Sequence, residues 1–235
     1  TYFEIDTLLC EGSSIYFANQ WISTAGIYRD SLVTEKGCDS IVTLNVKTAY
    51  KFDGNIIVSD ICADDSFIPV ILNYKGNTPT HYSVLFSQEA LKEGFINEPL
   101  KEFELIDSTI YIPVPHTEDR RDYPRPDIYS MKITVYDMYC GDSISSFHNF
   151  TISYPSWITD VRWNDAIILY NDQYNGGYKF SNIQWYYNGE PIDGETKDFL
   201  YQVHTLDTDG YYQARLTRID DGKTFFTCPV YPQLT

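Results

Sequence analysis

Cysteines and histidines are the side chains of this chain with the clearest chemistry. The five cysteines are scattered, at Cys10, Cys38, Cys62, Cys140 and Cys228. None belongs to a C-x-x-C pair and no histidine follows at a zinc-finger distance, so a zinc site is poorly supported. The four histidines also lack a metal-binding spacing such as H-E-x-x-H. Two alternatives remain for the cysteines: buried reduced thiols, or disulfides in an oxidising compartment, which we favour.

Pairs of acidic residues are the pattern that a glycoside hydrolase would need. Examples here are Asp64–Asp65, Glu102–Glu104 and Asp220–Asp221. Among 33 Asp and Glu residues such pairs arise by chance, and the last pair, followed by Gly222, is typical of a hairpin turn. The sequence has no G-x-S-x-G motif. We therefore predict that the chain is not an enzyme.

Calcium binding is the other chemistry that acids support, because hard cations bind several oxygens. Asp207, Asp209 and Gly210 form a D-x-D-G string, and further acids cluster around Cys62. The string lacks the distal Glu of a calcium-binding loop and lies where a tight turn is expected. We predict no cofactor, with calcium as the alternative.

The composition excludes several classes of protein. Lys and Arg number 17 against 33 Asp and Glu, and the resulting net charge of −16 repels phosphate backbones, so we expect no nucleic-acid partner. Hydrophobic residues make up 43% and charged residues 21%, which excludes a disordered chain. No apolar run is long enough to span a bilayer. The chain starts at Thr1 without a leader, which indicates a mature or trimmed fragment.

Strand patterns dominate the chain, and helical periodicity is almost absent. Runs rich in Val, Ile, Tyr, Phe and Thr alternate with turn sequences such as KGN and NGG. Short strands with frequent turns favour β-sandwiches over a parallel α/β sheet. The exception is 87–93, where Ser87 precedes a helix-forming segment and predicts one short helix, an irregular loop being the alternative. We predict an all-β chain of tandem immunoglobulin-like β-sandwich modules.

Two predicted boundaries divide the chain into modules at 1–50, 51–155 and 156–235. The first boundary follows a strand that ends in NVK, and the second is at YPSW, where Pro155 ends a strand. The first module is near the lower size limit for independent folding, so it needs a stabilising cross-link or contacts with a neighbouring module.

The C-terminal module carries the most specific local pattern. Trp185 lies in IQWYYNGEPIDG, and TDGYYQARL follows some 25 residues later. An immunoglobulin-type sandwich has a core Trp on its third strand and a Tyr near the start of its sixth. Trp185 and Tyr212 fit these roles, which predicts structural core positions. Ala214 stands where the second cysteine of that sandwich would be, so the resemblance is to the version without a disulfide.

Longer strings resemble modules of secreted or surface proteins of Bacteroidetes. NGGYKFSNIQWYYNGEPIDGETKDFLY is similar to their C-terminal Ig-like modules, and CEGSSIYF, AGIYRDSL and GCDSIVTLNV are similar to a repeat found in tandem in those proteins. ICADDSFIPVILNY and YCGDSI resemble a domain that often lies between the two. The resemblance implies extracytoplasmic β-modules of mostly uncharacterised role within a longer chain, and it brings no catalytic residues.

Cysteine spacing is compatible with one disulfide inside each of the first two modules. Cys10 and Cys38 lie within the first module, and Cys62 and Cys140 bracket the second. We predict structural disulfides Cys10–Cys38 and Cys62–Cys140, with Cys228 free as a small core residue.

The predicted function is a non-catalytic structural, adhesive or spacer module of a secreted or cell-surface protein. The alternative is a glycan-binding module or an accessory domain of a polysaccharide-processing enzyme, because tyrosine rings stack on sugars. Candidates for such contacts lie near turns, at Tyr174, Tyr178 and Tyr187. The expected partners are other modules of a longer chain and a protein or glycan ligand on the cell exterior.

Overall fold

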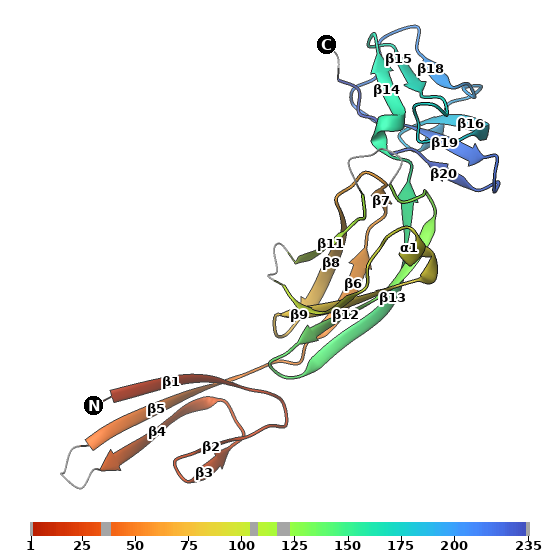
Figure 1. Ribbon diagram of the computed structural model, residues 1–235. Coiled ribbons are helices and arrows are strands. Elements are labelled where there is room, and N and C mark those ends of the chain that lie inside the picture. The colour runs from red at the N-terminus through yellow and green to blue at the C-terminus, as the bar shows by residue number, and fades with distance from the viewer. Residues whose placement is uncertain (1, 34–38, 104–107, 117–122, 234–235) are drawn as a thin grey trace.

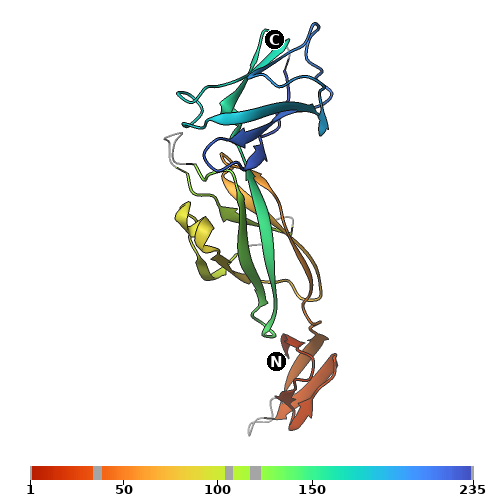
Figure 2. The same cartoon turned by 90° about the vertical axis from the view of Figure 1, so that its right-hand side faces the viewer.

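The computed structural model describes residues 2–33, 39–103, 108–116 and 123–233, and the fold is all-β, as the sequence predicts. Figures 1 and 2 show three modules in a row, with the N-terminal and C-terminal modules at opposite ends of the middle one. Each module has its own cluster of buried apolar side chains. The predicted short helix is confirmed as α1 (Gln88–Lys92), and the Ser87 hydroxyl caps it by accepting the Ala90 N–H at 3.3 Å. In the described ranges no helix is long and apolar enough to cross a membrane.

The N-terminal module is a three-stranded sheet packed against a short hairpin. In the sheet, β1 (Tyr2–Leu9) is parallel to the central β5 (Asp39–Thr48), and β4 (Gly26–Val33) is antiparallel to it. The hairpin consists of β2 (Ile15–Phe17) and β3 (Gln20–Ile22). Among the described residues of this module the buried cluster is small, consisting of Leu9, Ile22, Leu44 and Val46. Apolar burial therefore contributes little to the stability of this module.

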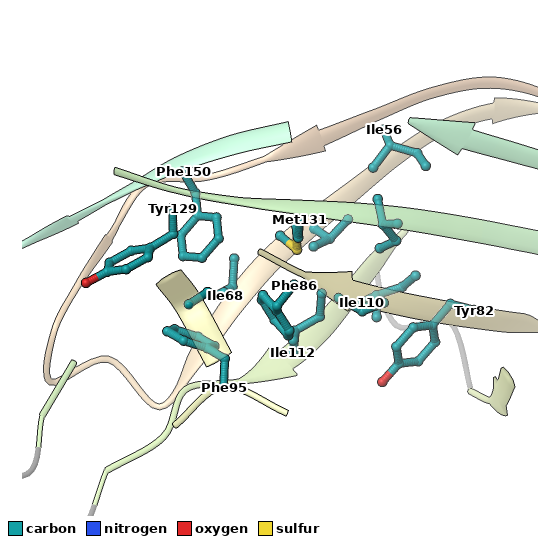
Figure 3. Close-up of a cluster of buried hydrophobic side chains, with 14 of the residues drawn as sticks. Ile56, Ile68, Tyr82, Phe86, Phe95, Ile110, Ile112, Tyr129, Met131 and Phe150 are labelled. Atoms are coloured by element: carbon teal, nitrogen blue, oxygen red, sulfur yellow. The ribbon is translucent and has the colours of Figure 1, made fainter. Parts of the chain in front are cut away.

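The middle module is a two-layer β-sandwich with strand orders β10-β9-β12-β13-β7 and β11-β8-β6. Its strands are β6 (Asp53–Val58), β7 (Ile61–Cys62), β8 (Phe67–Lys75), β9 (His81–Phe86), β10 (Glu98–Glu102), β11 (Thr109–Pro113), β12 (Ile128–Asp137) and β13 (Asp142–Ser153). Buried and outward-facing residues alternate along β12, as expected for a strand with one face in a core. Figure 3 shows the aromatic rings of Phe86, Phe95, Tyr129 and Phe150 gathered between the sheets with Ile68, Ile112 and Met131.

The C-terminal module is a second sandwich, with strand orders β14-β15-β18 and β17-β16-β19-β20. It begins with a 3-10 turn, η1 (Ser156–Ile158), and its strands are β14 (Thr159–Arg162), β15 (Ala166–Leu169), β16 (Phe180–Tyr187), β17 (Glu190–Pro191), β18 (Phe199–Tyr201), β19 (Tyr212–Arg218) and β20 (Thr224–Phe226). The β16–β17 hairpin turns at Asn188 and Gly189, which both have positive φ, as in a tight Asn-Gly hairpin turn.

Candidate functional site: two disulfide-linked module junctions

Two disulfides join different modules, so the predicted pairing is wrong. Cys10 is bonded to Cys140, and Cys62 is bonded to Cys228. The sequence predicted the pairs Cys10–Cys38 and Cys62–Cys140. Cys228, which was predicted to be free, is bonded, and Cys38 lies outside the described residues.

The length of β13 explains why Cys62 does not bond to Cys140. Cys62 pairs in register with Ser153 at one end of β13, whereas Cys140 lies in the turn just before Asp142 at the other end. At about 3.3 Å per residue, the 12-residue β13 is roughly 36 Å long. The bonded cysteines have Cα atoms only 5.6 and 5.7 Å apart. The two cysteines of the middle module therefore face opposite neighbours.

The first junction joins the end of β1 to the β12–β13 turn. Next to the Cys10–Cys140 bond, the Tyr139 hydroxyl donates to the Leu8 carbonyl at 2.8 Å. The Ala49 N–H donates to the Leu9 carbonyl at 2.9 Å, which keeps the end of β1 beside the segment that leads into the middle module. The N-terminal module is thus attached at two covalent points, the chain itself and the disulfide.

A buried carboxylate shapes the turn that carries Cys140. Asp137 is 1% exposed, and one of its oxygens accepts the Tyr139 N–H at 2.9 Å while the other accepts the Asn77 side-chain amide at 2.8 Å. The same amide lies 3.4 Å from the Cys140 sulfur. Gly141 closes the turn with a φ of 79° and donates its N–H to the Asp137 carbonyl. These contacts hold the cysteine at the end of the sandwich that faces the N-terminal module.

At the second junction the chain passes between sandwiches without a linker. β13 ends at Ser153, and the next residue, Tyr154, forms a parallel bridge with Thr227 of the C-terminal module. The Tyr154 N–H donates to the Phe226 carbonyl, and the Tyr154 carbonyl accepts the Cys228 N–H, both at 2.9 Å. The Tyr154 side chain is fully buried in the C-terminal core. The Cys62–Cys228 bond adds a covalent link beside this bridge.

An ionic network crosses the same boundary. Arg218 at the end of β19 is 1% exposed and pairs with Asp221 through Nε at 3.0 Å and Nη2 at 2.7 Å. Its remaining terminal nitrogen donates to the carbonyl of Pro126 in the middle module. Asp127, also in the middle module, accepts a hydrogen bond from Lys223 of the C-terminal module. Because a buried guanidinium is costly unless it is paired, this network depends on both modules being in place.

Arg125 extends the network on the side of the middle module. Its guanidinium pairs with Asp220 and lies 3.1 Å from an oxygen of Asp221. The hydrogen bond from Arg218 holds the pKa of Asp221 well below its usual range, and that from Arg125 lowers the pKa of Asp220. The sequence indicated only a hairpin turn at 220–222. The opposite charges of Arg125 and the Asp220–Asp221 pair were the available signal, but they did not show that these residues meet.

The acids around Cys62 cap backbone N–H groups. Asp60 and Asp65 each accept a backbone N–H, at 2.7 and 2.8 Å, and Asp64 accepts the N–H at the start of η1 at 3.0 Å. Asp64 also lies close to the sulfurs of Cys62 and Cys228. Because these sulfurs are bonded to each other, they offer no thiolate to a metal ion.

Trp185 and Tyr212 lie in the C-terminal core. Trp185 is 0% exposed and donates its indole N–H to the Lys197 carbonyl at 2.9 Å. The hydroxyl of the buried Tyr212 accepts the N–H of Asp207, five residues upstream, at 3.0 Å, as in an immunoglobulin tyrosine corner. Asp207 in turn accepts the Asp209 N–H at 2.9 Å, so the D-x-D-G string forms the turn at this corner.

The three tyrosines considered as ligand contacts lie in different surroundings. Tyr174 is 63% exposed. Tyr178 is half-buried, with its ring centroid 5.1 Å from that of Tyr154. The Tyr187 hydroxyl donates to Asp207 at 2.6 Å, and this hydrogen bond raises the pKa of Tyr187 to about 12. Only Tyr174 among the three offers an exposed ring.

Sequence reasoning missed the outward face of the four-stranded sheet in the C-terminal module. A hollow of about 420 Å³ lies over this face and is lined by Asn182, Gln184, Tyr186, Pro191, Arg215, Thr217 and Thr224. The alternation of polar residues along 182–186 was a local signal. The facing residues of β19 depend on the strand register, which the sequence does not reveal.

No family model matches the chain, and no curated protein matches it. Among solved structures, the chain is similar to the fibronectin(III)-like modules of CbhA from Clostridium thermocellum, with 11% identity, 75% of this chain and 90% of that chain covered, and a TM-score of 0.26. The chain is also similar to the N-terminal four Ig domains of Dscam1, with 14% identity, 82% of this chain and 49% of that chain covered, and a TM-score of 0.25. Its similarity to Drosophila N-cadherin EC1-3 has 11% identity, covers 97% of this chain and 96% of that chain, and has a TM-score of 0.29. At this level the similarity concerns fold alone and carries no argument about function.

Proposed function

We propose that this chain is a rigid, non-catalytic spacer in a secreted or cell-surface protein. The observation that carries the proposal is that the disulfides Cys10–Cys140 and Cys62–Cys228 both cross a module boundary. A disulfide inside a module stabilises that module, whereas one between modules restricts their relative orientation. Because structural disulfides persist in oxidising compartments, they also support an extracytoplasmic location.

The two junctions restrict motion by different means. At the first, the disulfide and the connecting chain are supplemented by the Tyr139–Leu8 hydrogen bond. At the second, a backbone bridge and the Arg218 network act together with the disulfide. We therefore expect the first junction to become a hinge when its disulfide is absent, and the second to keep its geometry.

Two of the three acidic pairs considered for catalysis make contacts within the fold, whereas Glu104 of the third pair lies outside the described residues. Asp220 and Asp221 are ion-paired across the second junction. Asp64 and Asp65 cap backbone donors. These four carboxylates are therefore engaged in contacts within the fold, which supports a structural function for this part of the chain.

Small-angle X-ray scattering of the oxidised chain tests the proposal. A compact globule of 235 residues would have a radius of gyration of about 18 Å. The 12-residue β13 alone is roughly 36 Å long at about 3.3 Å per residue, and one module lies beyond each of its ends (Figures 1 and 2). The radius of gyration of such an extended particle should clearly exceed that of the globule.

For the oxidised monomer we expect a radius of gyration clearly above that of the globule, and a value near about 18 Å would contradict the proposal. The double variant Cys10→Ser/Cys140→Ser should broaden the distribution of distances in the scattering data. The matched variant Cys62→Ser/Cys228→Ser should leave that distribution close to that of the parent. Equal broadening in both variants would contradict the distinction between the junctions.

A further inference from the structure

Polar side chains form a regular array on the outward face of the four-stranded sheet in the C-terminal module. Alternate residues of a strand point to the same face, and residues in register on neighbouring strands share that face. Three pairs of β16 and β19 residues meet here in register: Asn182 with Thr217, Gln184 with Arg215, and Tyr186 with Gln213. The hollow of about 420 Å³ lies over this array.

Arg215 is the cation of this hollow. Its side chain is exposed, and in the described part of the chain its guanidinium makes no hydrogen bond or ion pair. Arg218 and Arg162 of the same module are both ion-paired. Among the described residues no carboxylate lines the hollow, although the chain has a net charge of −16. An unpaired guanidinium in such an acidic protein is complementary to an anionic ligand.

The neutral groups of the hollow have the chemistry that recognises sugars. The Asn182 amide and the Tyr186 hydroxyl both donate and accept hydrogen bonds, as sugar hydroxyls do. The hydroxyls of Thr217 and Thr224 lie 2.9 Å apart and add two further polar groups. The Tyr186 ring meets the Phe226 ring edge-on, with centroids 5.0 Å apart, so its orientation is held by packing.

Two further features favour a saccharide over an acidic peptide. Pro191 is the only aliphatic residue among the described lining residues, so the hollow has no apolar pocket for a peptide anchor. The hollow also lies over the face of the sheet rather than along an edge, where a peptide strand would find backbone partners. A single cation suits a ligand with isolated carboxylates better than a densely sulfated one.

We propose that this face binds a uronate-containing oligosaccharide. The planar guanidinium of Arg215 pairs with a sugar carboxylate, for which its geometry is suited. Tyr186 contacts the face of a sugar ring, and Asn182 with Thr217 hydrogen-bonds to its hydroxyl groups. The site does not depend on the spacer role, because all its residues belong to one module.

A glycan array with the intact oxidised chain tests this proposal. The uronate probes are oligogalacturonate, oligoalginate and a hyaluronan hexasaccharide. The comparison probes are cellohexaose, a galactan oligosaccharide, a heparin hexasaccharide and a poly-glutamate peptide. We expect at least one uronate probe to bind more tightly than every comparison probe, with affinity falling as salt is raised.

Variants then assign the binding to this face. Arg215→Gln should weaken the uronate complex about tenfold or more, because it removes a charge-assisted hydrogen bond. Arg29→Gln, a matched change of an exposed Arg on β4, should leave affinity unchanged. Circular dichroism of both variants should match that of the parent, since both residues are exposed.

Three results would overturn the proposal. One is that no uronate probe binds. Another is that a neutral, sulfated or peptide probe binds at least as tightly as the uronates. The third is that Arg215→Gln leaves uronate affinity unchanged.

Discussion

Replacing Cys10 and Cys140 with Ser should destabilise the N-terminal module selectively. When this module opens alone, the disulfide holds Cys10 on the folded middle module, and the chain leaves the module at Ala49. The open segment is then a loop of about 40 residues with both ends fixed, for which the chain-entropy model gives about 4 kcal/mol. The described residues of the module include a buried cluster of only four, so this restraint is comparable to the total stability of the module.

Native-state hydrogen exchange of the Leu44 and Val46 amides measures the opening free energy, because both residues are buried on the central strand β5. The double Ser variant should lower this opening free energy by about 2 to 4 kcal/mol, which raises the equilibrium constant for opening about 30- to 700-fold. Cys62→Ser/Cys228→Ser is the matched control, and it should leave these two amides unchanged. A loss below about 0.5 kcal/mol in the first variant would refute the reasoning, because the module would then be stable by itself.

Two further predictions concern the second junction and the C-terminal core. Asp221→Asn should lower the melting temperature at pH 7. Because Arg218 depresses the pKa of Asp221, the stabilisation is fully present above pH ~4 and is lost as the pH falls toward the lowered pKa. The difference in melting temperature between parent and variant should therefore shrink as the pH falls from about 4 to about 2, and a constant difference would contradict this. Tyr212→Phe should cost about 1 kcal/mol in urea unfolding, because the Asp207 N–H loses its acceptor. Tyr174→Phe, a matched change on an exposed ring, should leave the free energy of unfolding unchanged. Equal losses in the two variants would argue against a stabilising Tyr212–Asp207 hydrogen bond.

Local patterns were sufficient to predict the fold class. The alternation in β12 and the Ser87 cap are properties of a few consecutive residues, and the structure contains both features. Trp185 and Tyr212 were predicted to be core residues from the strand and turn patterns around them, and both are buried. None of these predictions required knowing which modules contact one another.

The disulfides and the ionic network depend on how the modules meet. Spacing suggested that Cys62 and Cys140 form a pair because both lie in the middle module, but the length of β13 separates them. The burial of Arg218 depends on Pro126 and Asp127 of another module, which no local pattern indicates. The exposed Arg215 was overlooked for a similar reason, since its surroundings follow from the register of β16 and β19.

Mapping the disulfides of the oxidised chain tests the spacer proposal most directly. Digestion with pepsin at acidic pH, without reductant, suppresses thiol exchange because thiolates are protonated there. Mass spectrometry should then find Cys10 linked to Cys140 and Cys62 linked to Cys228. Peptides that link Cys10 to Cys38, or Cys62 to Cys140, would contradict the claim that the disulfides link neighbouring modules.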